Sequence, residues 1–275
     1  MLYSDINFYN LIGVDSMKIS LCQLNIKWED KEENFLIAEE KMLTAFKMGA
    51  EVLFLPEMSF TGFSMNTALT AESDNYTVNR IKKLCRKYNI ALGFGWVRRC
   101  GDKAENCYTV VDKTGEELCT YVKIHPFSYG GEDKFFVKGT ELVSYELGGM
   151  NFSTAICYDT RFPELFQGIC RDNKTDVIVI PANWPAKRAE HWKTLVRARA
   201  IENQVYVVAV NCIGEIGGTE YSGDSCIINP NGEIVECAES YNQLIFAELD
   251  YDIENLRKIF PVRQDRQIEL YKNIL

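Results

Sequence analysis

The chain has 275 residues, of which 47% are hydrophobic and 25% charged, a balance that excludes disordered and fibrous proteins. Its formal net charge of −9 disfavours nucleic acid or an anionic membrane as the main partner, although a local cluster of positive charge could still bind a small anion. No apolar stretch is long enough to span a bilayer and the ten cysteines include no C-x-x-C pair, so we expect free thiols, no metal site and a reducing cytoplasm.

The beginning of the chain does not resemble a secretory signal, because residues 1–16 lack both a basic start and an apolar centre. Met17 opens the first strand-like run and is a candidate for the native start. We therefore treat residues 1–16 as an extension of unknown role and predict a single domain over residues 17–275.

The first half alternates apolar strands with amphipathic helices. The predicted elements are a strand at 18–26, a helix within 28–50, a strand at 51–57, a helix around 77–89, a strand at 90–97 and a hairpin at 107–125 that turns at Lys113 to Glu116. In the first helix, Leu36, Met42, Leu43 and Phe46 stand near helical spacing.

The second half repeats this order. The predicted elements are a strand at 151–159, a helix around 163–173, a strand at 176–185, a long helix from Glu190 to Asn203, a strand at 205–214 and a hairpin at 222–239 that turns at Pro230 to Gly232. No Gly- or Ser-rich linker separates the halves, so the pattern predicts two layers of one α/β domain.

Four apolar strands end in residues that can do chemistry, namely Glu57, Lys123, Cys157 and Asn183. Ligands of open α/β sheets gather beyond the carboxyl ends of the strands, so these four side chains are candidates for one site. Each also has an ordinary structural explanation, as a capping acid, an edge-strand charge, a core thiol and a turn former respectively.

The requirements of other cysteine enzymes limit the mechanisms that are open to Cys157. A papain-like dyad needs a histidine, and the chain has only His125 and His191. A thiol phosphatase needs an arginine six residues after the cysteine, where this chain has Pro163. No complete glycine-rich nucleotide loop is present either. A glutamate must then be considered as the base, with a lysine as the cation.

Three strings carry a resemblance to a known family, in the expected order: "LPEMSFTGF", "KIHPF" and "AICYDTRFPELF". They resemble the three motifs that supply glutamate, lysine and cysteine in the nitrilase superfamily of carbon–nitrogen hydrolases. The resemblance extends from about Met17 to the C-terminus. It implies a four-layer αββα sandwich that pairs through its helices into dimers or larger homo-oligomers.

Three further strings resemble the omega-amidase branch of that superfamily: "PANWPAKRAEHWKTLVRARAIENQVYVVAVNCIG", "YSGDS" and "FPVRQDRQIELY". The resemblance implies a cofactor-free hydrolase of small-molecule amides, acting on the terminal amide of 2-oxoglutaramate or 2-oxosuccinamate. One departure is Cys212-Ile213, where bacterial members have an arginine in "NRVG". This difference affects either substrate fit or packing.

The chemistry assigns a role to each member of the triad. Cys157 is the predicted nucleophile and Glu57 the base that takes its proton. Lys123 and the backbone N–H of Tyr158 are predicted to stabilise the oxyanion. Glu132, in "GGEDKFFVKG", resembles a further glutamate that the superfamily places near the lysine, although by itself it is an ordinary loop acid.

Substrate contacts are predicted for Arg188, Asn183 and Phe127. The Arg188 guanidinium matches a carboxylate in a bidentate way, and the alternative is an arginine at the surface start of a helix. We expect His125 to support the site from behind, and Arg161 and Glu164 to brace the turn after the nucleophile rather than contact substrate.

Two other kinds of function remain open at this level. One is a different amidase of the superfamily, such as a deaminated-glutathione amidase or an N-carbamoyl hydrolase. The other is a catalytically silent scaffold, which the presence of Glu57, Lys123 and Cys157 together disfavours.

Overall fold

The computed structural model describes residues 16–171 and 174–274. The predicted extension, residues 1–16, therefore lies outside the described part except for Ser16, which is the first residue of β1 (Ser16–Gln23). Among the described residues, no helix combines the length and apolar character that crossing a bilayer requires.

One six-stranded sheet is built mainly from the first half of the chain. Its strands follow the order β14-β1-β2-β3-β4-β5, in which β1, β2 and β3 are parallel and the other pairs antiparallel. Besides β1, these strands are β2 (Val52–Phe54), β3 (Ala91–Cys100), β4 (Lys103–Val111), β5 (Glu117–Val122) and β14 (Gln243–Asp250).

The second six-stranded sheet repeats this plan, in the order β13-β12-β9-β8-β7-β6 with β7, β8 and β9 parallel. Its strands are β6 (Ser144–Leu147), β7 (Met150–Thr154), β8 (Val177–Ala182), β9 (Tyr206–Asn211), β12 (Cys226–Ile228) and β13 (Ile234–Cys237). A separate two-stranded hairpin consists of β10 (Ile213–Ile216) and β11 (Thr219–Ser222).

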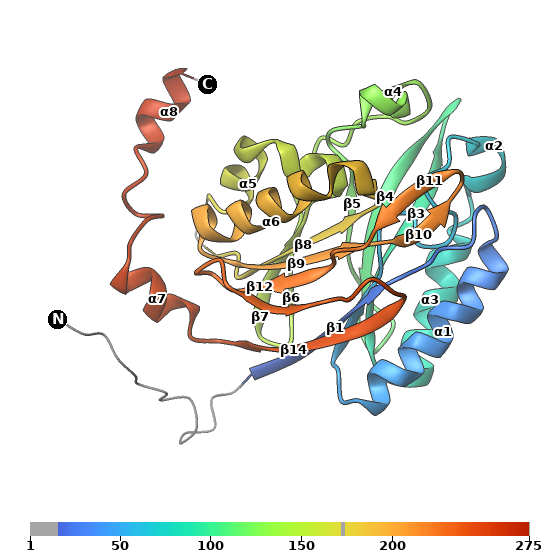
Figure 1. The fold of residues 1–275 in the computed structure, drawn as a ribbon, viewed down its shortest axis with the longest axis horizontal. Helices are drawn as coiled ribbons and strands as arrows, with labels where there is room; N and C mark the ends of the chain where they lie inside the picture. Colours follow the sequence, from blue (N-terminus) through green and yellow to red (C-terminus); the bar gives the residue numbers. More distant parts are fainter. Residues whose placement is uncertain (1–15, 172–173, 275) are drawn as a thin grey trace.

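Helices cover the outer face of each sheet, as Figure 1 shows. The helices on the first sheet are α1 (Lys31–Lys47) and α3 (Tyr76–Tyr88), and those on the second are α5 (Pro163–Ile169) and α6 (Ala189–Asn203). The other helices are α2 (Thr67–Thr70), α4 (Glu132–Phe135), α7 (Ile253–Ile259) and α8 (Ile268–Ile274). The predicted four-layer αββα sandwich is confirmed.

The hydrophobic core has two main parts. In one, residues of both sheets pack together, with Phe54 of β2 against Phe152 of β7 at 6.1 Å between ring centroids. In the other, α1 and α3 pack on the first sheet through residues such as Phe35 and Ile81. The residues after β2, β7 and β8 meet at one side of the sandwich, because the Asn183 N–H donates to Glu57 Oε2 and Asn183 lines the same pocket as Cys157.

Two details of the sequence prediction were wrong. The run 205–214 is not one strand, because β9 ends at Asn211 and the chain then forms the separate β10–β11 hairpin, whose turn uses Gly217 and Gly218 at positive φ. Leu36 and Phe46 of α1 are 61% and 45% exposed, since the buried face of the helix is formed by Phe35, Ala38, Met42 and Ala45.

Candidate active site

Glu57 follows β2 in a turn that depends on the absence of a side chain at Gly95. Met58 has a φ of 44°, and the turn is held by Ser59, whose hydroxyl donates to the Pro56 carbonyl and accepts from the Gly95 N–H at 2.9 Å. A Cβ at Gly95 would lie 2.2 Å from the Met58 nitrogen and 2.8 Å from the carbonyl carbon of Glu57. Close approach of β3 therefore sets the position of the Glu57 backbone.

Gly95→Ala should consequently displace Glu57. Because the clash is with backbone atoms, we expect a loss of about 1–3 kcal/mol of stability and a fall of at least about tenfold in kcat/KM. Thermal unfolding and steady-state kinetics measure the two effects. Gly168→Ala is the control, since a Cβ there meets only Leu142 at 3.4 Å. Unchanged activity of Gly95→Ala would contradict this account of the turn.

Lys123 joins two buried carboxylates. Its Nζ lies 2.8 Å from Glu57 Oε1 and 2.9 Å from Glu132 Oε2, and all three side chains are at most 1% exposed. Asn106 Nδ2 also donates to both acids, at 2.7 Å to Glu57 Oε1 and 2.9 Å to Glu132 Oε1. The lysine and the amide thus hold the two carboxylates in one buried network.

Asn183 connects this network to the second sheet. Its backbone N–H donates to Glu57 Oε2 at 2.8 Å, and its side-chain amide donates to the Glu57 carbonyl at 2.6 Å. The Asn183 Oδ1 atom lies 3.1 Å from the sulfur of Cys212. Residues from both sheets therefore fix the orientation of the Glu57 carboxylate.

Cys157 occupies a sharp turn after β7, with a φ of 47° that is unusual for a residue other than glycine. A one-turn 3₁₀ helix begins at this residue. The turn is held by buried Asp159, which accepts hydrogen bonds from the Ile156 N–H at 2.9 Å, from Tyr121 Oη at 2.8 Å and from the His125 N–H at 2.9 Å. His125 Nδ1 is also 2.8 Å from this carboxylate. His125 thus supports the turn from behind.

The electrostatics of the site follow from burial. Burial raises the pKa of the Cys157 thiol well above 9.0, and Glu57 raises it further, whereas Lys123 and the Asn183 backbone oppose the shift. Burial also raises the pKa of Glu132 against the opposing effect of Lys123. For Lys123, burial favours the neutral amine, but Glu132 and Glu57 outweigh it and raise the pKa of the ammonium. The geometry thus combines a protonated thiol with a cationic lysine at neutral pH.

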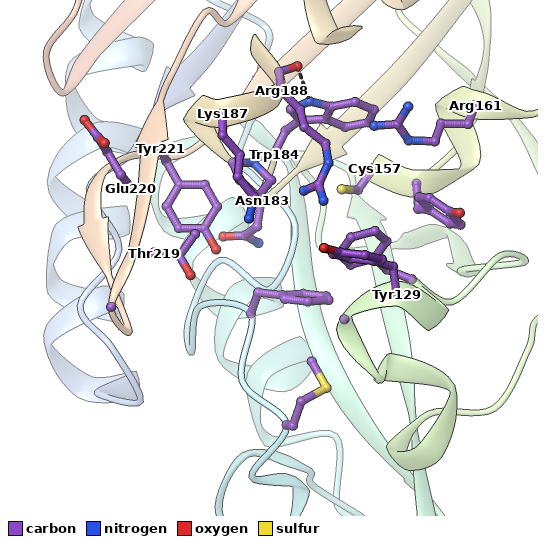
Figure 2. Close-up of a pocket in the computed structure, with 17 residues that line it drawn as sticks. Tyr129, Cys157, Arg161, Asn183, Trp184, Lys187, Arg188, Thr219, Glu220 and Tyr221 are labelled. Atoms are coloured by element: carbon purple, nitrogen blue, oxygen red, sulfur yellow. Dashed lines mark hydrogen bonds between the residues drawn. The ribbon is translucent and has the colours of Figure 1, made fainter.

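A pocket of about 490 Å³ opens above Cys157 (Figure 2). Cys157 and Asn183 reach it from the strand ends, and aromatic rings form much of its wall. The lining residues are Phe63, Met65, Phe127, Tyr129, Gly130, Cys157, Tyr158, Arg161, Asn183, Trp184, Pro185, Lys187, Arg188, Gly218, Thr219, Glu220 and Tyr221. Among the described residues, no group of three or more His, Cys, Asp and Glu side chains is arranged to hold a metal ion.

Positive charge gathers on one side of this pocket. The Arg188 guanidinium lies over the rings of Phe127 and Tyr129, at 5.6 and 5.1 Å from their centroids. Arg161 stacks over Trp184 at 4.5 Å. Burial lowers the pKa of Arg161, and neighbouring Arg188 contributes in the same direction because the two positive charges repel each other. Glu220 also lines the pocket, but Figure 2 shows its carboxylate directed away from Arg188.

The residues singled out from the sequence mostly lie together. Glu57, Lys123, Glu132 and Asn183 belong to the buried network, and Cys157, Tyr158, Phe127 and Arg188 line the pocket above it. The position of Arg161 differs from the expectation. It was expected to brace the turn rather than contact substrate, but it stands in the pocket wall. Glu164 does not line the pocket.

Sequence reasoning missed Asn106, Trp184 and Tyr221. Asn106 lies in β4 directly before the apolar part of that strand and is 1% exposed; its polar neighbours in the sequence gave no signal that it is buried. Tyr221 belongs to the β10–β11 hairpin, which was not predicted. Cys212 is buried beneath the pocket and contacts Asn183, so its place is in the packing around Glu57 rather than in the pocket wall.

Comparison with known proteins agrees with this architecture. The chain is 34% identical to the 2-oxoglutaramate amidase of Bacillus subtilis (strain 168), over 92% of this chain and 98% of the relative. It is 33% identical to the omega-amidase YafV of Escherichia coli (strain K12), over 90% of this chain and 96% of the relative. A CN-hydrolase superfamily protein of Xanthomonas campestris has the same fold, with a TM-score of 0.86, 29% identity and coverage of 92% of this chain and 98% of that chain. The carbon–nitrogen hydrolase model matches residues 18–258, and the chain belongs to this family.

Proposed function

We propose that the protein hydrolyses the terminal amide of a 2-oxo dicarboxylic acid monoamide, such as 2-oxoglutaramate or 2-oxosuccinamate, to the 2-oxo acid and ammonia. Relatives that carry the names 2-oxoglutaramate amidase and omega-amidase, aligned over most of the chain, support this substrate class. The proposed reaction uses side chains and one backbone N–H of the protein, together with a water molecule.

The proposed first stage forms a thioester. Glu57 accepts the Cys157 thiol proton as the sulfur attacks the amide carbon, because burial keeps the thiol protonated and a preformed thiolate is scarce. The Lys123 ammonium and the Tyr158 backbone N–H stabilise the carbonyl oxygen as it becomes anionic. Glu57 then returns the proton to the departing nitrogen, which leaves as ammonia.

The proposed second stage hydrolyses the thioester. Glu57 takes a proton from a water molecule, whose oxygen attacks the thioester carbon, and the proton passes to the cysteine sulfur as the acid leaves. Glu132 contributes by sharing Lys123, which keeps the lysine charged and oriented toward the reacting carbonyl.

The observation that carries the choice of substrate is the pair of arginines in the pocket. Both are partly buried, and among residues 16–171 and 174–274 neither forms an ion pair with a carboxylate. Two guanidiniums without a carboxylate partner in one pocket favour an anionic ligand, and a carboxylate accepts two hydrogen bonds from a guanidinium. We propose that Arg188, with Arg161, grips the carboxylate remote from the scissile amide, while Phe127 and Asn183 complete the pocket.

Arg188→Ala should therefore raise KM for 2-oxoglutaramate about 10- to 100-fold, because a charge-assisted contact contributes about 1.5–3 kcal/mol. The variant should fold normally, since Trp184 Nε1 donates to the backbone carbonyl of Arg188, which the substitution keeps. Arg188→Lys should restore only part of the affinity. Ammonia release measured on 2-oxoglutaramate, 2-oxosuccinamate and neutral propionamide checks these expectations.

Lys187→Ala is the matched control, because Lys187 is an exposed cation next to Arg188 in the same pocket. Its effect should be several-fold smaller than that of Arg188→Ala. If Arg188→Ala weakened neutral and anionic amides equally, the arginine would be structural. If the wild-type protein released ammonia from neither 2-oxo acid amide, but did so from N-carbamoyl amino acids or deaminated glutathione, the substrate assignment would be wrong.

We further propose a homodimer or larger homo-oligomer in a reducing cytoplasm. All ten cysteines are free thiols, which supports a reducing compartment. Ile259 and Phe260, at the end of α7, are 76% and 67% exposed, and an apolar pair at the surface favours burial against a second copy.

A further inference from the structure

Asn106 touches both acids of the buried network, although no step of the proposed reaction uses it. It lies in β4, is 1% exposed, and donates from one side-chain nitrogen to Glu57 and to Glu132. Its backbone carbonyl also accepts a hydrogen bond from the backbone N–H of Lys123, at 2.9 Å. One residue thus contacts the proposed base, the second glutamate and the lysine.

The orientation of the Asn106 amide follows from these partners. If the amide were turned over, its oxygen would face two carboxylate oxygens, which cannot donate while ionised. In the observed orientation the two N–H groups point at the two acids, and Oδ1 has no hydrogen-bond partner among the described residues. Burying Oδ1 without a hydrogen-bond partner costs free energy. The two hydrogen bonds that Nδ2 donates offset this cost and account for an asparagine in the interior of the strand.

The network has an excess of negative charge that Asn106 offsets. The groups that face the Glu57 carboxylate are Lys123, Glu132, Cys157, Cys212 and Tyr221. Of these, Lys123 supplies the positive charge, so two carboxyl groups share one ammonium. Like charges at this separation favour uptake of a proton by the pair. Neutral N–H donors directed at both acids oppose that uptake without adding a charge.

We propose that Asn106 is a positioning residue that keeps Glu57 ionised, and therefore able to accept the Cys157 proton, by donating to Glu57 and Glu132 at once. The inference rests on the roles of Glu57 and Cys157 in the proposed function. Its consequence is that the pH at which the carboxylate pair takes up a proton depends on Asn106. Without the Asn106 amide, the pair of carboxylates binds this proton at a higher pH, so Glu57 stops acting as a base at a higher pH.

The test measures alkylation of Cys157 by iodoacetamide as a function of pH, followed by peptide mass spectrometry so that the other thiols do not interfere. Asn106→Leu removes both donors at similar volume. The acidic limb is the part of the pH profile in which the alkylation rate of Cys157 falls as the pH falls. We expect this limb to move to higher pH by about one unit, so that at a given pH on the limb the variant reacts about tenfold more slowly than the wild-type protein. Asn106→Asp keeps the shape of the side chain and should shift the limb in the same direction. This variant provides the test if Asn106→Leu does not fold.

Asn203→Leu is the matched control. Asn203 is also fully buried and donates to the Arg199 carbonyl at 3.0 Å, but it lies on α6, outside the pocket lining. It should lower the midpoint of thermal unfolding without moving the acidic limb. An unmoved limb in both Asn106 variants would overturn the inference, whatever their stability.

Alkylation does not depend on the identity of the substrate, so the two proposals can fail separately. If the limb moves but no 2-oxo acid amide is hydrolysed, the proposed role of Asn106 is supported and the substrate assignment is wrong. If the amides are hydrolysed and the limb does not move, the substrate assignment stands and Asn106 is only structural.

Discussion

Cys157→Ala should lower kcat/KM for 2-oxoglutaramate by at least about 10⁴-fold, because removal of a nucleophile abolishes the covalent route and leaves only binding and oxyanion stabilisation. The fold should persist. Alanine retains the backbone interactions of the turn, which Asp159 holds through the Ile156 N–H. Steady-state ammonia release and thermal unfolding measure the two expectations, and a mass shift for the thioester should disappear with the thiol.

Cys226→Ala is the matched control for this variant. Cys226 is 7% exposed and Cys157 8%, so both substitutions remove a buried sulfur, but Cys226 lies in β12 outside the pocket lining. The control should retain most of the activity. Appreciable turnover by Cys157→Ala, at a rate that purification does not reduce, would show that another group is the nucleophile.

Glu57→Gln should reduce the rate of thioester formation by about 10²- to 10⁴-fold, the usual contribution of a general base. The carboxylate accepts from Lys123 and Asn106 through Oε1 and from the Asn183 N–H through Oε2. A glutamine cannot accept on both sides, so its NH₂ group would oppose one of these donors. We therefore expect a lower midpoint of thermal unfolding as well as slow acylation, and rapid-quench measurement of the first ammonia released should show no burst.

Glu72→Gln separates the loss of a base from the loss of a buried carboxylate. Glu72 is 8% exposed and pairs with Lys31 at 2.9 Å, away from the pocket. This control should lose stability and keep the rate of acylation. A burst of normal rate in Glu57→Gln would assign the base to another group, with Glu132 as the next nearest carboxylate to Lys123.

Several features of this protein were determined by its sequence alone. Apolar runs that stop at Glu57, Cys157 and Asn183 predicted strand ends with reactive residues, because strand periodicity and its interruption are local properties of the chain. The turn at Lys113 to Glu116 and the long helix up to Asn203 were likewise predicted, since turn residues and helical spacing act over a few positions. The resemblance of three motifs to those of the nitrilase superfamily then implied the four-layer sandwich.

Only the tertiary structure decided which residues surround the reactive ones. Asn106 and Glu57 are 49 positions apart in the chain, and their hydrogen bond exists because β4 lies beside β3, which packs under the Glu57 turn at Gly95. Arg161 stands in the pocket wall because the 3₁₀ helix that begins at Cys157 ends at this residue. Hydrogen bonds and charge interactions across two sheets depend on register and close approach, and no pattern within one segment carries that information.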